Sequence, residues 1–169
     1  FTEDYVPFLS KISKVFKIAS GDFNFKPLIK ACVKTKKPII LSTGLATIKE
    51  IQSTLKWIKE YGGKEYLKKI VLLQCVTAYP TPIEQANVLS MTYLKKKFKT
   101  LVGYSNHVMG SEACLAAVSL GASVIEVHFT DNKKNRKFHD HALSFEPDEL
   151  KEFIKNEKKI KLSLGQFSK

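Results

Sequence analysis

The feature that most constrains this chain is an alternation, repeated five times, of short apolar runs with longer segments of helical period. The short runs predict strands at 15–20, 38–44, 70–76, 101–105 and 123–129. Helices are expected after them, at 26–36, 47–62, 90–98, 111–121 and 147–165. Successive strands joined by helices run parallel, and strands this apolar are covered on both faces. The sequence therefore predicts an α/β protein built on a parallel sheet.

Polar side chains recur at or near the carboxyl ends of all five predicted strands. These residues are Lys17, Ser20, Ser42, Thr43, Gln74, Thr77, Tyr79, Ser105, Asn106, His107, Glu126 and His128. Such a ring is typical of a β/α barrel, which gathers its functional groups at that end, whereas an open sheet has its site at one switch point. A G-x-G-x-x-G turn follows none of the strands, which disfavours a dinucleotide-binding fold.

The length of the chain decides how much of a barrel it can form. A complete (β/α)8 TIM barrel needs about 200 residues or more, and 169 residues leave room for five units. A smaller α/β sheet is the alternative. We expect residues 1–169 to form a single partial catalytic domain, the C-terminal part of such a barrel with strands four to eight, and its first three strands to be absent. We expect this partial barrel alone to be inactive, because an unclosed barrel leaves two sheet edges exposed.

The two histidines that end neighbouring strands are the strongest candidates for chemistry. Neutral imidazoles are common ligands of divalent metals, and His107 and His128 lie where their rings could converge. Glu126 is two residues before His128, so both side chains point to the same face of the strand. Two imidazoles completed by water and substrate oxygens would form an open catalytic site. The alternative is that each histidine only forms a local hydrogen bond.

Other polar residues suggest an anion site and a lid. Lys17 interrupts a buried strand, and could bind a phosphate or carboxylate, form a Schiff base, or extend to solvent. Hydroxyls at the strand ends can donate to phosphate oxygens. In the loop that follows the last strand, His139 and His141 resemble a metal-binding tract, but the loop is equally suited to bring Asp140 over the pocket as a lid.

The net charge of +12 raises the possibility of nucleic-acid binding. Arg136, however, is the only arginine among 28 basic residues, and base and phosphate recognition favours the planar fork of arginine. A solvated lysine-rich surface, with no nucleic-acid partner, is the simpler interpretation.

Cysteine usage and hydropathy indicate the compartment. Cys32, Cys75 and Cys114 lie in apolar contexts and are expected to be buried, reduced thiols, as in a cytoplasmic protein. The apolar runs are far shorter than the roughly 20 residues that span a bilayer. The first ten residues lack the features of a signal peptide. We therefore expect no membrane partner.

Five motifs taken together resemble the sialic acid synthase family, which includes N-acetylneuraminate synthase and the legionaminate and pseudaminate synthases. They are "KIASGDFNFKPLIKACVKTKKPIILSTGLATIKEI", "LLQCVTAYPTP", "VGYSNHVMG", "GASVIEVHFT" and "DHALSFEPDEL", in the family's order and spacing. The resemblance implies condensation of phosphoenolpyruvate with an N-acetylmannosamine-type sugar, giving a nonulosonic acid and phosphate. It also implies a homodimer for the full-length protein, with an antifreeze-like domain after the barrel that this chain lacks.

The resemblance assigns roles to the candidate residues. His107 and His128 would hold a divalent metal, Mn²⁺ or Mg²⁺. Phosphoenolpyruvate would lie among Lys17, Ser20, Ser42, Thr77 and Ser105. Tyr79 and Gln74 would contact the sugar, and Glu126 and Asp140 would be catalytic.

The chain also departs from the family pattern, at Asn106, at Val127 and in the loop "KNRKFHDH". The alternatives are another metal-dependent TIM-barrel synthase of aldol type, a barrel hydrolase, or a lysine-rich nucleic-acid-binding module.

Overall fold

One parallel sheet organises the protein. The computed structural model describes residues 2–166. Its five-stranded sheet has the order β1-β2-β3-β4-β5, and every neighbouring pair is parallel. The strands are β1 (Phe16–Ile18), β2 (Ile39–Ser42), β3 (Ile70–Gln74), β4 (Leu101–Ser105) and β5 (Val124–Glu126). The parallel order confirms the predicted α/β class, and β1 and β5 are the two edges of the sheet.

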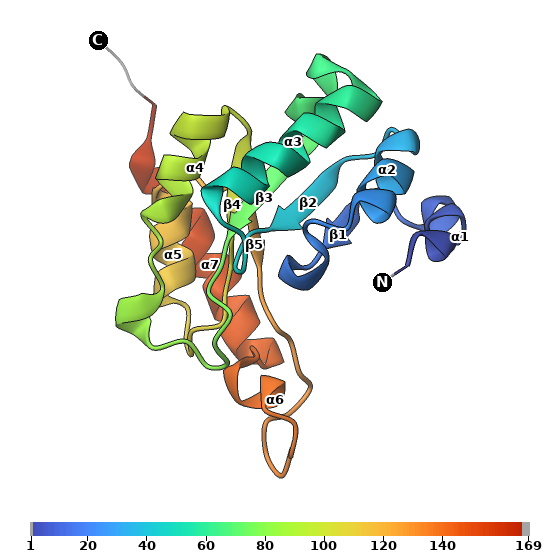
Figure 1. Ribbon diagram of the computed structural model, residues 1–169. Helices are drawn as coiled ribbons and strands as arrows, with labels where there is room; N and C mark the ends of the chain where they lie inside the picture. The colour runs from blue at the N-terminus through green and yellow to red at the C-terminus, as the bar shows by residue number, and fades with distance from the viewer. Residues whose placement is uncertain (1, 167–169) are drawn as a thin grey trace.

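A helix follows each strand and packs on the sheet (Figure 1). These helices are α2 (Lys26–Lys34), α3 (Ile48–Gly62), α4 (Ser90–Phe98), α5 (Glu112–Ser119) and α7 (Pro147–Leu164). The chain is thus an open part of a β/α barrel with five strand–helix units. Two helices were not predicted, α1 (Val6–Ile12) and the short α6 (Asp140–Leu143). The latter lies with the loop before it at one end of the molecule, drawn in orange in Figure 1. None of the described helices is long and apolar enough to cross a membrane.

Local sequence explains where the helices begin. Thr47 and Glu50 form a reciprocal capping box at the start of α3, and Glu146 and Glu149 form another at the start of α7. Each box satisfies backbone amides that have no partner within the helix. Pro147 occupies the first turn of α7, where its missing N–H costs nothing.

The strand register separates two faces of the sheet. Ile18, Leu41, Leu72 and Val102 are aligned across four strands and are buried in the core beneath the helices. Residues one position away along each strand point to the opposite face. That opposite face carries Lys17, Ser42, Ser105 and Glu126. Because successive side chains of a strand point to opposite faces, these four polar groups point towards the barrel interior.

The last strand is shorter than the sequence predicts. The range 123–129 was expected, but β5 ends at Glu126, whose carbonyl accepts a final bond from the Asn106 amide. Beyond Glu126 the chain leaves β4 and pairs instead with the segment that follows α6. In that pairing the Phe145 amide donates to the His128 carbonyl at 2.8 Å. His128 therefore lies just beyond the strand, in a connection held by residues after α6.

Candidate active site

Three aromatic rings meet at the carboxyl ends of β3, β4 and β5. The ring centroids of His107 and His128 are 5.3 Å apart. Tyr79, from the loop after β3, stacks on His107 at 4.1 Å and meets His128 edge-on at 5.9 Å. The structure thus brings together the two histidines that the sequence placed on consecutive strands.

The hydrogen bonds of His107 fix which ring nitrogen is free. Its Nδ1 is 2.6 Å from the carbonyl oxygen of Val76. Because a carbonyl only accepts, Nδ1 carries the proton and Nε2 keeps its lone pair. His107 is buried, and this burial lowers its pKa below the ordinary value of 6.5, which favours the neutral ring. A neutral imidazole with a carbonyl-bound N–H is the usual state of a metal-ligating histidine.

Asp140 reaches the same place from the loop after β5. One of its carboxylate oxygens is 3.7 Å from Nδ1 of His128, and the other is 3.0 Å from Nε2 of His139. His141 is turned elsewhere, because its Nδ1 is hydrogen-bonded to the Thr130 hydroxyl at 2.7 Å. His139 and His141 therefore do not form a pair of metal ligands, since neighbouring residues of this turn face different partners.

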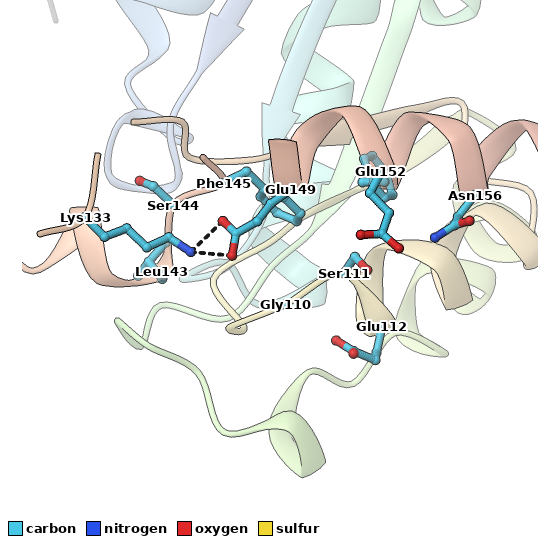
Figure 2. Close-up of a pocket in the computed structure, with 11 residues that line it drawn as sticks. Gly110, Ser111, Glu112, Lys133, Leu143, Ser144, Phe145, Glu149, Glu152 and Asn156 are labelled. Carbon is cyan, nitrogen blue, oxygen red and sulfur yellow. Dashed lines mark hydrogen bonds and ion pairs between the residues drawn. The ribbon is translucent and has the colours of Figure 1, made fainter. Parts of the chain in front are cut away.

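The loop that leads into α6, and so to Asp140, is fastened to the start of α7. The Lys133 ammonium contacts both carboxylate oxygens of Glu149, at 2.8 and 2.6 Å. The Lys133 amide donates to Glu146 at 2.7 Å. Figure 2 shows the ammonium and its partner at one side of a hollow of about 290 Å³ between α5 and α7. The contacts of Lys133 with Glu146 and Glu149, rather than the hollow itself, hold the loop against α7.

An ion pair crosses the barrel interior. The Lys17 ammonium is 3.2 Å from a carboxylate oxygen of Glu126. The pair gives the partly exposed lysine a partner and leaves its alternatives, an anion site or a Schiff base, chemically open.

A group of small polar side chains lies around Gly44, just after the carboxyl end of β2. The Ser20 hydroxyl accepts a hydrogen bond from the Gly44 amide at 3.0 Å and is 3.3 Å from the Cys75 sulfur. A Cβ on Gly44 would lie 2.6 Å from that sulfur and 2.7 Å from the Thr77 hydroxyl. Only glycine leaves this space open. Gly44 was missed by the sequence reasoning, although a glycine directly after a polar strand end was a usable signal.

Two buried serines contribute to the same interior face. Ser42 is 3% exposed, and within the described residues its hydroxyl has no hydrogen-bond partner. A buried hydroxyl without a partner is costly, which suggests that a ligand completes it. Ser105 is 4% exposed. Asn106 next to it is structural, because its side chain binds the carbonyl and amide of Val108.

Gln74 does not join this group. It is aligned with Tyr104, whose ring is buried in the core beneath the helices. The strand alternation therefore places Gln74 on the helix-facing side, and its neighbour Cys75 on the interior side. The predicted contact of Gln74 with a sugar has no geometric support.

The donor set suits a metal with an open coordination sphere. Two imidazoles lie side by side, and the tautomer of His107 leaves Nε2 free to bind. Within residues 2–166, no group of three or more His, Cys, Asp or Glu side chains is arranged to hold a metal. The remaining ligands would therefore be water or substrate oxygens, as in other open catalytic sites.

Comparison with known proteins identifies the family of the chain. The NeuB family model matches residues 1–169. The N,N'-diacetyllegionaminic acid synthase of Campylobacter jejuni is 44% identical over 152 residues, which are 90% of this chain and 45% of that protein. The N-acetylneuraminate-9-phosphate synthase of Drosophila melanogaster is 36% identical over 151 residues, 88% of this chain and 39% of that protein.

A solved structure of a related protein has the same fold. The sialic acid synthetase of Leptospira borgpetersenii superposes with a TM-score of 0.89 at 31% identity, covering 99% of this chain and 57% of that one. The chain spans about half the length of the curated relatives it matches. The match over its whole length, together with this fold, shows that the chain belongs to the NeuB family.

Proposed function

We propose that this chain forms the phosphoenolpyruvate- and metal-binding side of a synthase that makes a nonulosonic acid. The reaction would join phosphoenolpyruvate to an N-acylated amino sugar and release phosphate. The observation that carries the proposal is the juxtaposition of the His107–His128 pair with a cradle of hydroxyls around Gly44. The names of the relatives agree with it.

The cradle suits the anionic substrate. Lys17 supplies a positive charge, and Ser20, Ser42, Thr77 and Ser105 supply hydroxyl donors from four segments of the barrel interior. Hydrogen bonds to ionised oxygens are roughly twice as strong as neutral ones. The hydroxyl of Ser42, without a protein partner, gains the most from such a ligand.

The histidine pair and the nearby carboxylates suit the sugar. A divalent metal held by His107 and His128 would act as a Lewis acid on the sugar aldehyde. Asp140 and Glu126 would orient the sugar hydroxyls or an attacking water. Tyr79 covers His107 and would form an apolar wall.

The proposed reaction balances with one water. C3 of phosphoenolpyruvate forms the new bond to the aldehyde carbon, whose oxygen takes up a proton. Water adds at C2, and phosphate departs with the bridging oxygen.

The test is phosphate release by the full-length protein from phosphoenolpyruvate that carries ¹⁸O in the bridging position, measured with a divalent metal and with or without N-acetylmannosamine or a 2,4-diacetamido sugar. The proposal predicts that phosphate release depends on a sugar, that the label appears in the phosphate, and that the product mass equals that of the condensed acid. Release that is independent of any sugar would instead indicate a hydrolase.

A further inference from the structure

Cys75 lies at the centre of the proposed anion cradle, although the reaction assigns it no part. It is a free thiol, 6% exposed, on the interior face of the sheet. Its sulfur is 3.3 Å from the Ser20 hydroxyl oxygen, and it would lie 2.6 Å from a Cβ on Gly44. The other two cysteines, Cys32 and Cys114, belong to the core beneath the helices.

The hydrogen bonds of Ser20 define what the thiol can do. The Gly44 amide already donates to the Ser20 oxygen at 3.0 Å. A hydroxyl oxygen accepts two hydrogen bonds and donates one. If the thiol donates the second, the proton of Ser20 stays free for a substrate oxygen. If Ser20 instead donates to the sulfur, a weak acceptor, its proton is not available to a substrate oxygen.

An anion in the cradle decides between the two arrangements. A hydroxyl donating to an ionised oxygen forms a stronger bond than one donating to sulfur. We propose that Cys75 is a positioning residue for Ser20: its S–H donates to the Ser20 oxygen and directs the Ser20 proton to phosphoenolpyruvate. This inference rests on the proposed function, because it requires phosphoenolpyruvate to occupy the cradle.

The experiment measures the dissociation constant for phosphoenolpyruvate by calorimetry, with the KM for each substrate and kcat, in the wild type and three variants. Cys75→Ala should weaken binding about threefold to tenfold, the usual effect of one lost hydrogen bond. The KM for the sugar should stay unchanged. Cys75→Ser keeps a donor and should restore binding to within about twofold. Cys114→Ala removes a thiol outside the cradle and should bind like the wild type.

A double-mutant cycle separates positioning from packing. In a Ser20→Ala background, Cys75→Ala should have almost no further effect on the dissociation constant, because the hydroxyl it directs is gone. An equal loss in both backgrounds would overturn the proposal, as would wild-type affinity in Cys75→Ala or equal losses in the Ala and Ser variants. Because binding is the readout, a wild-type protein that binds phosphoenolpyruvate without turnover would contradict the proposed reaction alone. A wild type that does not bind it would overturn both.

Discussion

The ammonium of Lys17 and the carboxylate of Glu126 lie 3.2 Å apart, although they belong to the two edge strands of the sheet. Three strands separate β1 from β5, so the contact requires the sheet to curve until its edges face each other across the interior. About a third of each side chain is exposed, 32% and 36%. The pair therefore contributes little to stability, and a substrate anion can displace the carboxylate.

The two partners should respond oppositely to mutation. Lys17→Met removes the positive charge and should weaken phosphoenolpyruvate binding about tenfold to a hundredfold, as for a lost charged hydrogen bond. Glu126→Gln removes a competing anion, so binding should be unchanged or up to about threefold tighter while turnover falls. Calorimetric titration of both variants checks the signs. Weaker binding in Glu126→Gln would show that Glu126 supports the anion site directly.

Gly44 should tolerate no side chain. Gly44→Ala places a methyl group against the Cys75 sulfur and the Thr77 hydroxyl, and overpacking of this kind should weaken phosphoenolpyruvate binding at least about tenfold. Gly21→Ala is the matched control, since a Cβ there meets nothing within 4 Å. The two dissociation constants should differ clearly. Equal values would mean that the space beside Gly44 is not used by the ligand.

Buried thiols should make the fold sensitive to alkali. Burial raises the pKa of Cys114 to about 12 and that of Cys32 to about 11, from an ordinary value of 9.0. In the unfolded chain these thiols ionise at lower pH than in the folded protein. Their contribution to the free energy of unfolding should therefore be constant below pH 9. It should then fall as the pH rises towards 11 to 12, by about 1.4 kcal/mol per pH unit for each thiol.

The variant Cys114→Ala isolates this effect. Lysines and tyrosines titrate equally in both proteins, so only the difference in slope matters. Urea unfolding between pH 8 and 10.5 should show a shallower decline for Cys114→Ala, although a cavity lowers its stability at every pH. Identical slopes would mean that Cys114 does not titrate as described.

The order of strands and helices could be predicted because hydrophobic period is a local property of the sequence. The end of β5 could not, because it depends on the loop 131–145 folding back to pair with the residues beside His128. The free, buried state of the three cysteines was also predicted correctly.

The candidate site was predictable where it depends on the position of a residue along a strand or loop. His107 and His128 could be identified from their positions at strand ends, and Asp140 from its place in a loop that returns to the pocket. Gln74 was predicted to contact the sugar, but the strand register aligns it with Tyr104 on the helix-facing side of the sheet, opposite the face that carries Ser42 and Ser105. The cradle of Gly44 and Cys75 could not be predicted, because it depends on distances between residues of three different segments.

The metal site that we propose at His107 and His128 is tested most directly by titrating the protein with Mn²⁺ and following the free-ion signal by electron paramagnetic resonance. The account predicts that the wild type and His141→Ala, whose histidine faces Thr130, bind one Mn²⁺ with similar affinity. His107→Ala and His128→Ala should each weaken that binding at least about tenfold, because even the loss of a group that only orients a ligand costs about tenfold to a hundredfold. Wild-type affinity in His107→Ala would contradict the metal assignment.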